Sequence, residues 1–341
     1  MGWRVRQVWI PRTGGPEVLE VREAPDPEPA QGQVRIRVAA AGLNFADTLA
    51  RIGLYPDAPK LPTVMGYEVA GRIDKLGPGA AGEVGKRVLS FTRFGGHSEA
   101  VVVPAQQALP IPDDLSFEKA AALPVVYTTA WIMLVWLGNV RPGETVLVHA
   151  AAGGVGTAAL QICRARGARV IGTASASKHA RLKELGIAHA IDYTTQDFEV
   201  EVRRITAGRG VDIVLDAVGG ESLAKGYRCL APLGRLFTFG GSGFAPKGTR
   251  NPFHLIKGLL AMPSFKPLSL MNKNRGVFGV NLGHLWDEAE TLLTIMGDIL
   301  ALVREGKLDP IVDRTFRFEQ AADAHRLLQE RRNFGKVLLV P

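Results

Sequence analysis

The stretch from Thr145 to Gly156, TVLVHAAAGGVG, constrains this chain more than any other. An apolar, β-branched run comes first, the glycines Gly153, Gly154 and Gly156 follow, and the pattern then continues as a helix. In a βαβ unit this order places bare backbone and free helix N–H groups against the pyrophosphate of a dinucleotide, where a Cβ atom would block the approach. The stretch therefore predicts a dinucleotide-binding turn. Alanine stands at the first of the three usual glycine positions, Ala150, and a glycine turn without a ligand gives the same pattern.

The pattern beyond about residue 128 predicts a parallel, doubly wound sheet. Apolar segments of strand length alternate there with segments of helical periodicity, as in a sheet that is covered on both faces. This alternation is typical of an α/β domain of the Rossmann type. The expected strands are 145–150, 168–174, 188–193, 211–219, 234–241 and 275–282, and the expected helices are 154–166, 178–186, 196–207 and 221–231.

The rest of the chain has a different pattern of apolar residues. Between Val5 and about Pro110, short segments of period-two alternation are separated by glycine and proline, which predicts a mostly antiparallel, barrel-like β domain. Towards the end of the chain, β-like segments alternate with helices and are expected to return to this domain. The expected elements are a short helix at 43–53, helices at 286–305 and 319–331, and β segments at 308–318 and 335–341. We therefore expect a catalytic β domain at 1–127, a dinucleotide-binding domain at 128–283, and a return to the catalytic domain at 284–341.

Composition bears on the partners and the compartment. The 341 residues carry a net charge of +8, but the basic residues are spread along the chain, which favours a solvated surface over a nucleic-acid site. The two cysteines, Cys163 and Cys229, lack metal-ligand spacing and are expected to be buried thiols in a reducing compartment. The first residues lack the pattern of a signal peptide, so we expect a cytoplasmic protein.

The segment from 120 to 140 raises the question of a membrane span. It holds no charged residue and is long enough to cross a bilayer. It also contains Pro124, Gly138 and Asn139, and it leads directly into the predicted nucleotide-binding strand. We therefore expect a buried segment between the two domains.

The residues after the second predicted strand indicate which nicotinamide cofactor binds. An NAD site usually holds the adenosine ribose with an acidic residue about 20 positions past the glycines. Here no Asp or Glu occurs between Ala151 and Lys183, and the region offers Ser175, Ser177 and Lys178 instead. Hydroxyl groups and positive charge would hold a ribose 2′-phosphate, so the sequence predicts NADPH. The alternative is that these residues are only helix caps and exposed cations.

Several motifs together resemble the zinc-free quinone oxidoreductase group of the medium-chain dehydrogenase/reductase superfamily. They are AAGLNFADTLARIGLY (40–55), LPTVMGYEVAGRIDKLG (61–77), AAALPVVYTTAW (120–131), VLVHAAAGGVG (146–156), VDIVLDAVGG (211–220) and NFGKVLLVP (333–341). Within that group, NKNRGVFGVNLGHL (272–285) most resembles the vesicle amine transport protein homologues. The resemblance runs nearly the length of the chain and implies a GroES-like catalytic domain beside the Rossmann-type domain.

The departures from the superfamily pattern bear on the chemistry. In the zinc-dependent alcohol dehydrogenases of the superfamily, a cysteine and a histidine ligand occupy the positions that here hold Asn44 and Tyr67, and a third ligand would fall near Val125. The lobe that holds a structural zinc is absent as well. The resemblance therefore implies that the chain holds no zinc. Asp47 and Glu68 remain, and we expect them to pair with neighbouring cations.

The same resemblance implies a set of site residues. Asn44 and Tyr55 match cleft residues of the quinone oxidoreductases, and Tyr67 could face the same cleft; packing alone would also account for the two tyrosines. Leu49 stands where those enzymes often carry another tyrosine. The implied cofactor-binding residues are Thr129, Ala152, Gly153, Gly154, Val155, Gly156, Thr173, Ser175, Lys178, Tyr193, Phe239, Gly240, Gly241, Ser242, Phe278, Gly279, Val280, Asn333 and Lys336.

Two functions fit these features. The first is a zinc-independent, NADPH-dependent oxidoreductase that transfers hydride to a quinone or to the β-carbon of an α,β-unsaturated carbonyl. The second is an NADPH-binding protein with little turnover that acts through membrane or RNA association. Residues 251–271 are apolar with two lysines and would serve as a substrate lid in the first case or as a membrane contact in the second. The resemblance also implies a homodimer through the sheet-edge strand near Phe278.

Overall fold

The computed structural model describes residues 3–243, 258 and 260–341. These residues form two compact units. The first unit takes in the described residues up to Thr128 and from Gly283 onward, and the second takes in those from Thr129 to Leu282. The second unit is therefore inserted in the chain between two parts of the first.

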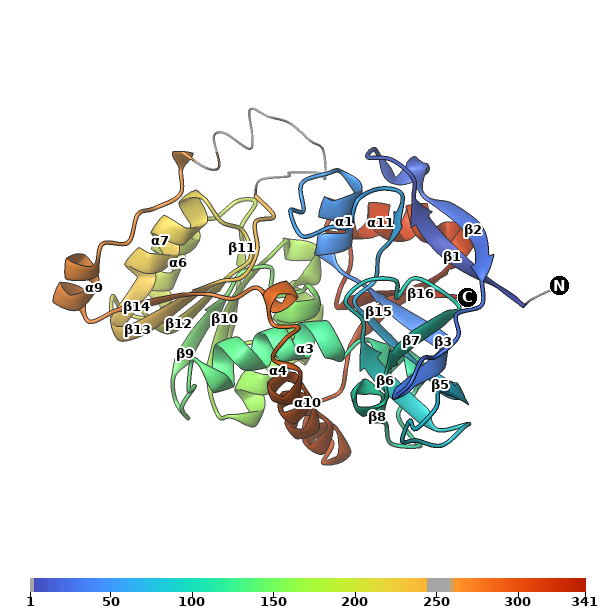
Figure 1. Ribbon diagram of the computed structural model, residues 1–341. Helices are drawn as coiled ribbons and strands as arrows, with labels where there is room; N and C mark the ends of the chain where they lie inside the picture. Colours follow the sequence, from blue (N-terminus) through green and yellow to red (C-terminus); the bar gives the residue numbers. More distant parts are fainter. Residues whose placement is uncertain (1–2, 244–257, 259) are drawn as a thin grey trace. The chain divides into compact units, whose positions relative to one another are not determined.

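Six strands of the second unit form one parallel sheet. They are β9 (Thr145–Val148), β10 (Arg169–Ala174), β11 (His189–Asp192), β12 (Val211–Asp216), β13 (Leu230–Thr238) and β14 (Gly276–Gly279). Their order is β11-β10-β9-β12-β13-β14 (Figure 1). The chain runs outward from β9 to β11 and then returns to β12 on the other side of β9, so the strand order reverses between β9 and β12. The predicted Rossmann-type sheet is confirmed.

Helices cover this sheet. They are α4 (Gly154–Ala165), α5 (His179–Glu184), α6 (Phe198–Ile205), α7 (Glu221–Cys229) and α9 (Pro267–Lys273). Because crossovers between parallel strands are right-handed, the helices before and after the reversal lie on opposite faces. On one face, Val202 of α6 and Leu223 of α7 are buried with Leu147 of β9. Cys163 and Cys229 are free and buried, as predicted.

Several strands are shorter than the sequence predicts at their carboxyl ends. β9 ends at Val148 rather than at residue 150, and Ala150 has a left-handed φ of 52°. β12 likewise ends at Asp216 rather than at 219, since Gly219 and Gly220 have φ values of 83° and 59°. A left-handed residue takes the chain out of the extended conformation that a ladder needs. The residues predicted as strand ends thus form the loops along one edge of the sheet.

The boundary between α7 and β13 also differs from the prediction. The expected helix at 221–231 ends at Cys229, and β13 begins at Leu230 rather than at 234. Pro232 lies just beyond, and a proline cannot continue the hydrogen bonds of a helix. β13 accommodates the extra residues with a register shift against β12.

The first unit is built mostly from antiparallel strands. They are β1 (Arg4–Ile10), β2 (Glu20–Pro25), β3 (Gln33–Leu43), β4 (Thr63–Val64), β5 (Glu68–Leu76), β6 (Arg87–Phe91), β7 (Ala100–Pro104), β8 (Leu109–Pro110), β15 (Val312–Arg317) and β16 (Lys336–Val340). One sheet has three strands in the order β2-β1-β4. The other has seven, in the order β15-β16-β3-β5-β6-β8 with β7 paired to β3. The predicted mostly antiparallel β domain is confirmed.

The end of the chain completes the larger sheet. β16 pairs antiparallel with β3, where Leu338 lies opposite Gly42, and β15 pairs in parallel with β16. The last segments of the chain therefore add two strands to the sheet of the first unit. The helices of this unit are α1 (Phe45–Arg51), α2 (Phe117–Ala121), α10 (Ala289–Arg304) and α11 (Ala321–Gln329).

The uncharged segment at 120–140 is mostly buried, as predicted. It forms α3 (Pro124–Trp131) and a π-helical turn (Ile132–Trp136). Met133 and Leu134 are fully buried, whereas Trp136 and Leu137 are exposed. Among the described residues, no helix combines the length and the hydropathy that crossing a bilayer requires.

The glycine turn before α4 makes a prediction about stability. A Cβ on Gly156 would lie 2.4 Å from the carbonyl oxygen of Ala150, whereas a Cβ on Gly153 would lie 3.3 Å from the same oxygen. We expect Gly156→Ala to lower the free energy of unfolding by about 1–3 kcal/mol, because the backbone must shift to admit the methyl group. Gly153→Ala is the matched control and should cost clearly less. Urea unfolding of both variants measures this, and equal losses would contradict the crowding argument.

Candidate active site

The second unit gathers most of the predicted cofactor residues at one edge of its sheet. Gly153 is the N-cap of α4, so the turn from Ala152 to Gly156 presents the first N–H groups of that helix. The carboxyl ends of parallel strands meet at the same edge, and residues that end or closely follow these strands lie there. They are Thr173, Ser175, Lys178, Tyr193, Phe239, Gly240, Gly241, Ser242, Gly279 and Val280. Phe278 lies within β14 and stacks on Phe237, and Thr129 is buried on α3.

A histidine and an aspartate that sequence reasoning did not single out lie at the point where the strand order reverses. His149 follows β9 and Asp216 ends β12, and the two strands are paired. The Nδ1 atom of His149 lies 3.1 Å from Oγ1 of Thr173, while Oδ1 of Asp216 accepts hydrogen bonds from the N–H groups of Val218 and Gly219. Burial lowers the pKa of His149, although the charge of Asp216 opposes this.

The remaining polar atoms of this pair fit a dinucleotide. Nε2 of His149 and Oδ2 of Asp216 are buried and have no hydrogen-bond partner within the described part of the chain. Buried polar atoms are nearly always paired, with protein, water or a ligand. Hydroxyl groups of a bound dinucleotide would pair with both atoms. These two unpaired atoms support a dinucleotide independently of the glycines. In the sequence, the only hint was that His149 lies within the stretch from Thr145 to Gly156.

The first unit contains a buried ion pair that involves Glu68, for which the sequence led us to expect a neighbouring cation. Nζ of Lys336 lies 2.5 Å from Oε1 of Glu68, and the two side chains are 3% and 0% exposed. The amide of Asn44 joins them: its Nδ2 donates to Glu68 at 2.9 Å, and its Oδ1 accepts from Lys336 at 2.6 Å. The other oxygen of Glu68 accepts from the backbone N–H of Val125 at 2.7 Å. Lys336 thus acts as an internal counter-ion, and its expected contact with the cofactor stays a prediction.

Asp47 is buried beside this network, but among the described residues no salt bridge joins it to a cation, so the pairing expected for Asp47 is not found. Its carboxylate accepts hydrogen bonds from the N–H groups of Asn44 at 2.7 Å and Gly66 at 3.3 Å. Burial raises the pKa of Asp47, while the charges of His97 and Lys336 and the two hydrogen bonds oppose the rise. Nothing in the part of the chain that is described brings three or more His, Cys, Asp or Glu side chains together to hold a metal ion.

An aromatic cavity of about 360 Å³ lies in the same unit. Tyr55, Tyr67, Phe94 and Trp286 form its apolar lining, and the Tyr67 ring is stacked parallel to Trp286 at 6.3 Å between centroids. The charged and polar lining comes from Asp57, Arg93, His284 and Asp287. The size and the mixture of aromatic and few polar groups suit a small planar ligand. The sequence indicated only the two tyrosines, because the other residues come from segments far apart in the chain.

The hydroxyl of Tyr67 is a buried donor that the protein leaves available. Tyr67 is 5% exposed, and its Oη has no hydrogen-bond partner of normal geometry in the described residues. Burial raises the pKa of Tyr67, and the negative charge of Asp47 raises it further. Burial also raises the pKa of Tyr55, whose ring meets that of Tyr67 edge to face at 6.4 Å. Both phenols are therefore protonated hydrogen-bond donors at neutral pH.

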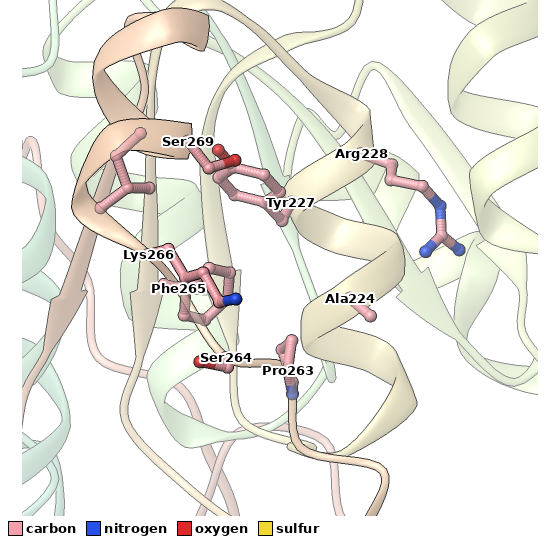
Figure 2. A pocket seen from close by; sticks show the side chains of 9 residues that line it. Ala224, Tyr227, Arg228, Pro263, Ser264, Phe265, Lys266 and Ser269 are labelled. Atoms are coloured by element: carbon pink, nitrogen blue, oxygen red, sulfur yellow. The ribbon is translucent and has the colours of Figure 1, made fainter.

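The second unit has a smaller hollow of about 170 Å³, shown in Figure 2. Tyr227 of α7 and Phe265 contact each other there at 5.2 Å between ring centroids, next to Lys266. The lining of this hollow comes from α7 and from residues 263–270, so these two segments lie next to each other. Of the segment 251–271, for which we expected a lid or a membrane contact, residues 251–257 and 259 lie outside the described residues. Within the rest, Leu260, Leu268 and Met271 are exposed.

Comparisons with known proteins agree with this architecture. Residues 30–113 match the family model described as alcohol dehydrogenase GroES-like domain, and residues 185–339 match the one described as zinc-binding dehydrogenase. The synaptic vesicle membrane protein VAT-1 homolog of Rattus norvegicus is 45% identical over 325 residues, which cover 95% of this chain and 80% of that protein. The chain belongs to the medium-chain dehydrogenase/reductase superfamily, with the VAT-1 homologues.

Solved structures of this superfamily share the fold. The Escherichia coli quinone oxidoreductase complexed with NADPH superposes with a TM-score of 0.87 at 31% identity, covering 98% of this chain and 100% of that one. The CurK enoyl reductase gives 0.85 at 29% identity, covering 98% and 99%. The chain is therefore an oxidoreductase of this superfamily. The family model is named for zinc binding. At the two positions where the resemblance places a cysteine and a histidine ligand, this chain carries Asn44 and Tyr67.

The buried ion pair predicts the effect of removing its cation. Lys336→Met leaves Glu68 charged and unpaired in the interior, so we expect the free energy of unfolding to fall by about 3–5 kcal/mol. Adding Glu68→Gln to this variant should recover part of the loss, because the amide still accepts from the N–H of Val125. Lys119→Met, which breaks the exposed pair with Asp309, is the control and should change little. Urea unfolding compares the three, and a Lys336→Met protein as stable as the control would refute the role of the pair.

Proposed function

We propose that this protein is a metal-independent, NADPH-dependent reductase of quinones or α,β-unsaturated carbonyls. The observation that carries the proposal is the buried Tyr67 hydroxyl, which lines an aromatic cavity and has no hydrogen-bond partner of normal geometry among the described residues. A polar donor in such a place serves to bind an oxygen atom of a flat, apolar molecule. The quinone oxidoreductase and enoyl reductase among the similar structures support the same acceptor classes.

The residues at the edge of the parallel sheet would hold the cofactor. When bound, NADPH supplies a hydride to the acceptor. The N–H groups from Ala152 to Gly156 would hold the pyrophosphate, and His149 and Asp216 would pair with hydroxyl groups. Ser175 and Lys178 would hold the 2′-phosphate that distinguishes NADPH from NADH. The NADPH complex of the Escherichia coli enzyme supports this choice.

The residues of the first unit would bind and polarise the acceptor. Reduction places negative charge on the acceptor oxygen, and two protonated phenols, Tyr67 and Tyr55, can donate hydrogen bonds to it. Asn44 is 9% exposed, and its amide is bound to Glu68 and Lys336, so it has one N–H left to offer. The main role of Asn44 would be to hold Glu68 in place, next to Tyr67 in the cavity wall.

We also propose a cytoplasmic homodimer. β14 lies at the edge of its sheet and can pair with the same strand of a second copy. The exposed Leu260, Leu268 and Met271 and the vesicle membrane protein named among the relatives support a second candidate, an NADPH-binding protein that contacts membranes with little turnover.

A turnover assay separates the two candidate functions. Protein stripped of metals by a chelator is mixed with NADPH or NADH and with a quinone, an enal or an enone, and cofactor oxidation is followed by absorbance. We expect turnover with NADPH at the same rate before and after chelation. Loss of activity on chelation would refute the metal-free mechanism. Tight NADPH binding without turnover on any acceptor would favour the binding protein.

The proposed phosphate contact predicts cofactor selectivity. Lys178→Ala should weaken NADPH binding by about tenfold, which corresponds to about 1.4 kcal/mol, and leave NADH binding unchanged, because only NADPH carries the 2′-phosphate. Lys183→Ala removes a cation from the same segment and is the control. Dissociation constants from protein fluorescence test this. Equal weakening of both cofactors by Lys178→Ala would contradict the assignment.

A further inference from the structure

Asp57 and His284 line the aromatic cavity and have no part in the roles above. They come from distant parts of the chain, the loop after α1 and the 3₁₀ turn Leu282–His284, and Nε2 of His284 lies 2.9 Å from Oδ2 of Asp57. The His284 side chain is 63% exposed and that of Asp57 32%. The imidazole is therefore open to water, and the carboxylate lies deeper in the protein.

Asp57 also acts on Tyr55. Burial is the main cause that raises the pKa of Tyr55, and the negative charge of Asp57 raises it further. The ring of Tyr55 meets that of Tyr67 edge to face at 6.4 Å between centroids. One cavity is thus lined by the exposed imidazole of His284, its partner Asp57, and the two phenols.

This arrangement suits proton delivery. The carboxylate of Asp57 contacts the imidazole at 2.9 Å and lines the same cavity as Tyr55, so it can take a proton on one side and pass one on at the other. Arg93 and Asp287 complete the charged lining of the cavity. An exposed ion pair contributes little to stability, so its removal can be read as an effect on the site rather than on the fold.

We propose that the Asp57–His284 pair positions Tyr55 and relays protons from water to it. The inference rests on the proposed reductase function. After the acceptor has received its hydride, it carries a negative charge, and the O–H bond of Tyr55 breaks as the proton passes to the acceptor. Protonated His284 gives a proton to Asp57, Asp57 gives one to the Tyr55 phenolate, and His284 takes a new proton from water. One proton is consumed per acceptor, and no electrons move in these steps.

Kinetics of two variants test the relay. We expect Asp57→Asn to lower kcat by about 100-fold, the lower end of the usual contribution of general acid catalysis. His284→Gln keeps a hydrogen-bond donor to Asp57 but cannot carry a proton through the ring, so it should lower kcat by about tenfold. In both, KM for the acceptor and the dissociation constant of NADPH should stay close to those of the wild type. Asp309→Asn, in the exposed pair with Lys119, is the control and should leave all constants unchanged.

A second readout needs neither cofactor nor turnover. The five tyrosines are labelled with ¹³C at Cζ and titrated by NMR, and Tyr55→Phe assigns the resonance of Tyr55. Asp57→Asn should lower the pKa of Tyr55, because the negative charge that raises it is gone. A wild-type protein that turns over no acceptor would refute the proposed function, yet this titration would still report whether Asp57 acts on Tyr55. Wild-type kcat in His284→Gln, or an unchanged Tyr55 titration in Asp57→Asn, would overturn the relay.

Discussion

The first unit depends on the buried ion pair between Lys336 and Glu68. Taking two charges out of water costs several kcal/mol for each ion, and the attraction repays this only when the remaining donors and acceptors are also satisfied. Here the amide of Asn44 contacts both partners, and the N–H of Val125 donates to the second carboxylate oxygen. The network ties β16 and β5 to the first residues of α1 and α3. It also fixes Tyr67, the chain neighbour of Glu68, in the wall of the aromatic cavity.

Close packing leaves this network little freedom. A Cβ on Gly42 would lie 2.3 Å from Oε1 of Glu68, so the strand opposite the carboxylate has to carry glycine there. The same strand pairs with β16, which brings Lys336 within reach from the end of the chain. The charge of the lysine is balanced by the glutamate, and Tyr55 and Tyr67 contribute neutral phenol donors to the cavity. Hydrogen-bond donors that the fold holds in place can stabilise a developing oxyanion without a metal.

Much of the fold could be predicted from local patterns, and the cofactor edge followed from it. The alternation of apolar strands and helices predicted the parallel sheet. Ser175, Tyr193 and Phe239 follow strands of this sheet, so they lie at its carboxyl edge regardless of the loop conformations. Strand ends were predicted too long, because left-handed residues such as Ala150 end the ladder without a glycine or proline signal. The ion pair of Glu68 with Lys336 and the contact of Asp57 with His284 join residues hundreds of positions apart, and no local pattern encodes such contacts. The unpaired atoms of His149 and Asp216 likewise become visible only in three dimensions.

A nicotinamide cofactor and phenol donors should suffice for reduction by this protein, and isotope transfer tests this most directly. Metal-stripped protein is given NADPH that carries deuterium at the transferable C4 position, together with an enone, and the product is examined by NMR. We expect one deuterium at the β-carbon of each product molecule and a solvent-derived proton at the neighbouring carbon. Product without deuterium at the β-carbon, or deuterium transfer that appears only when a metal ion is restored, would contradict it.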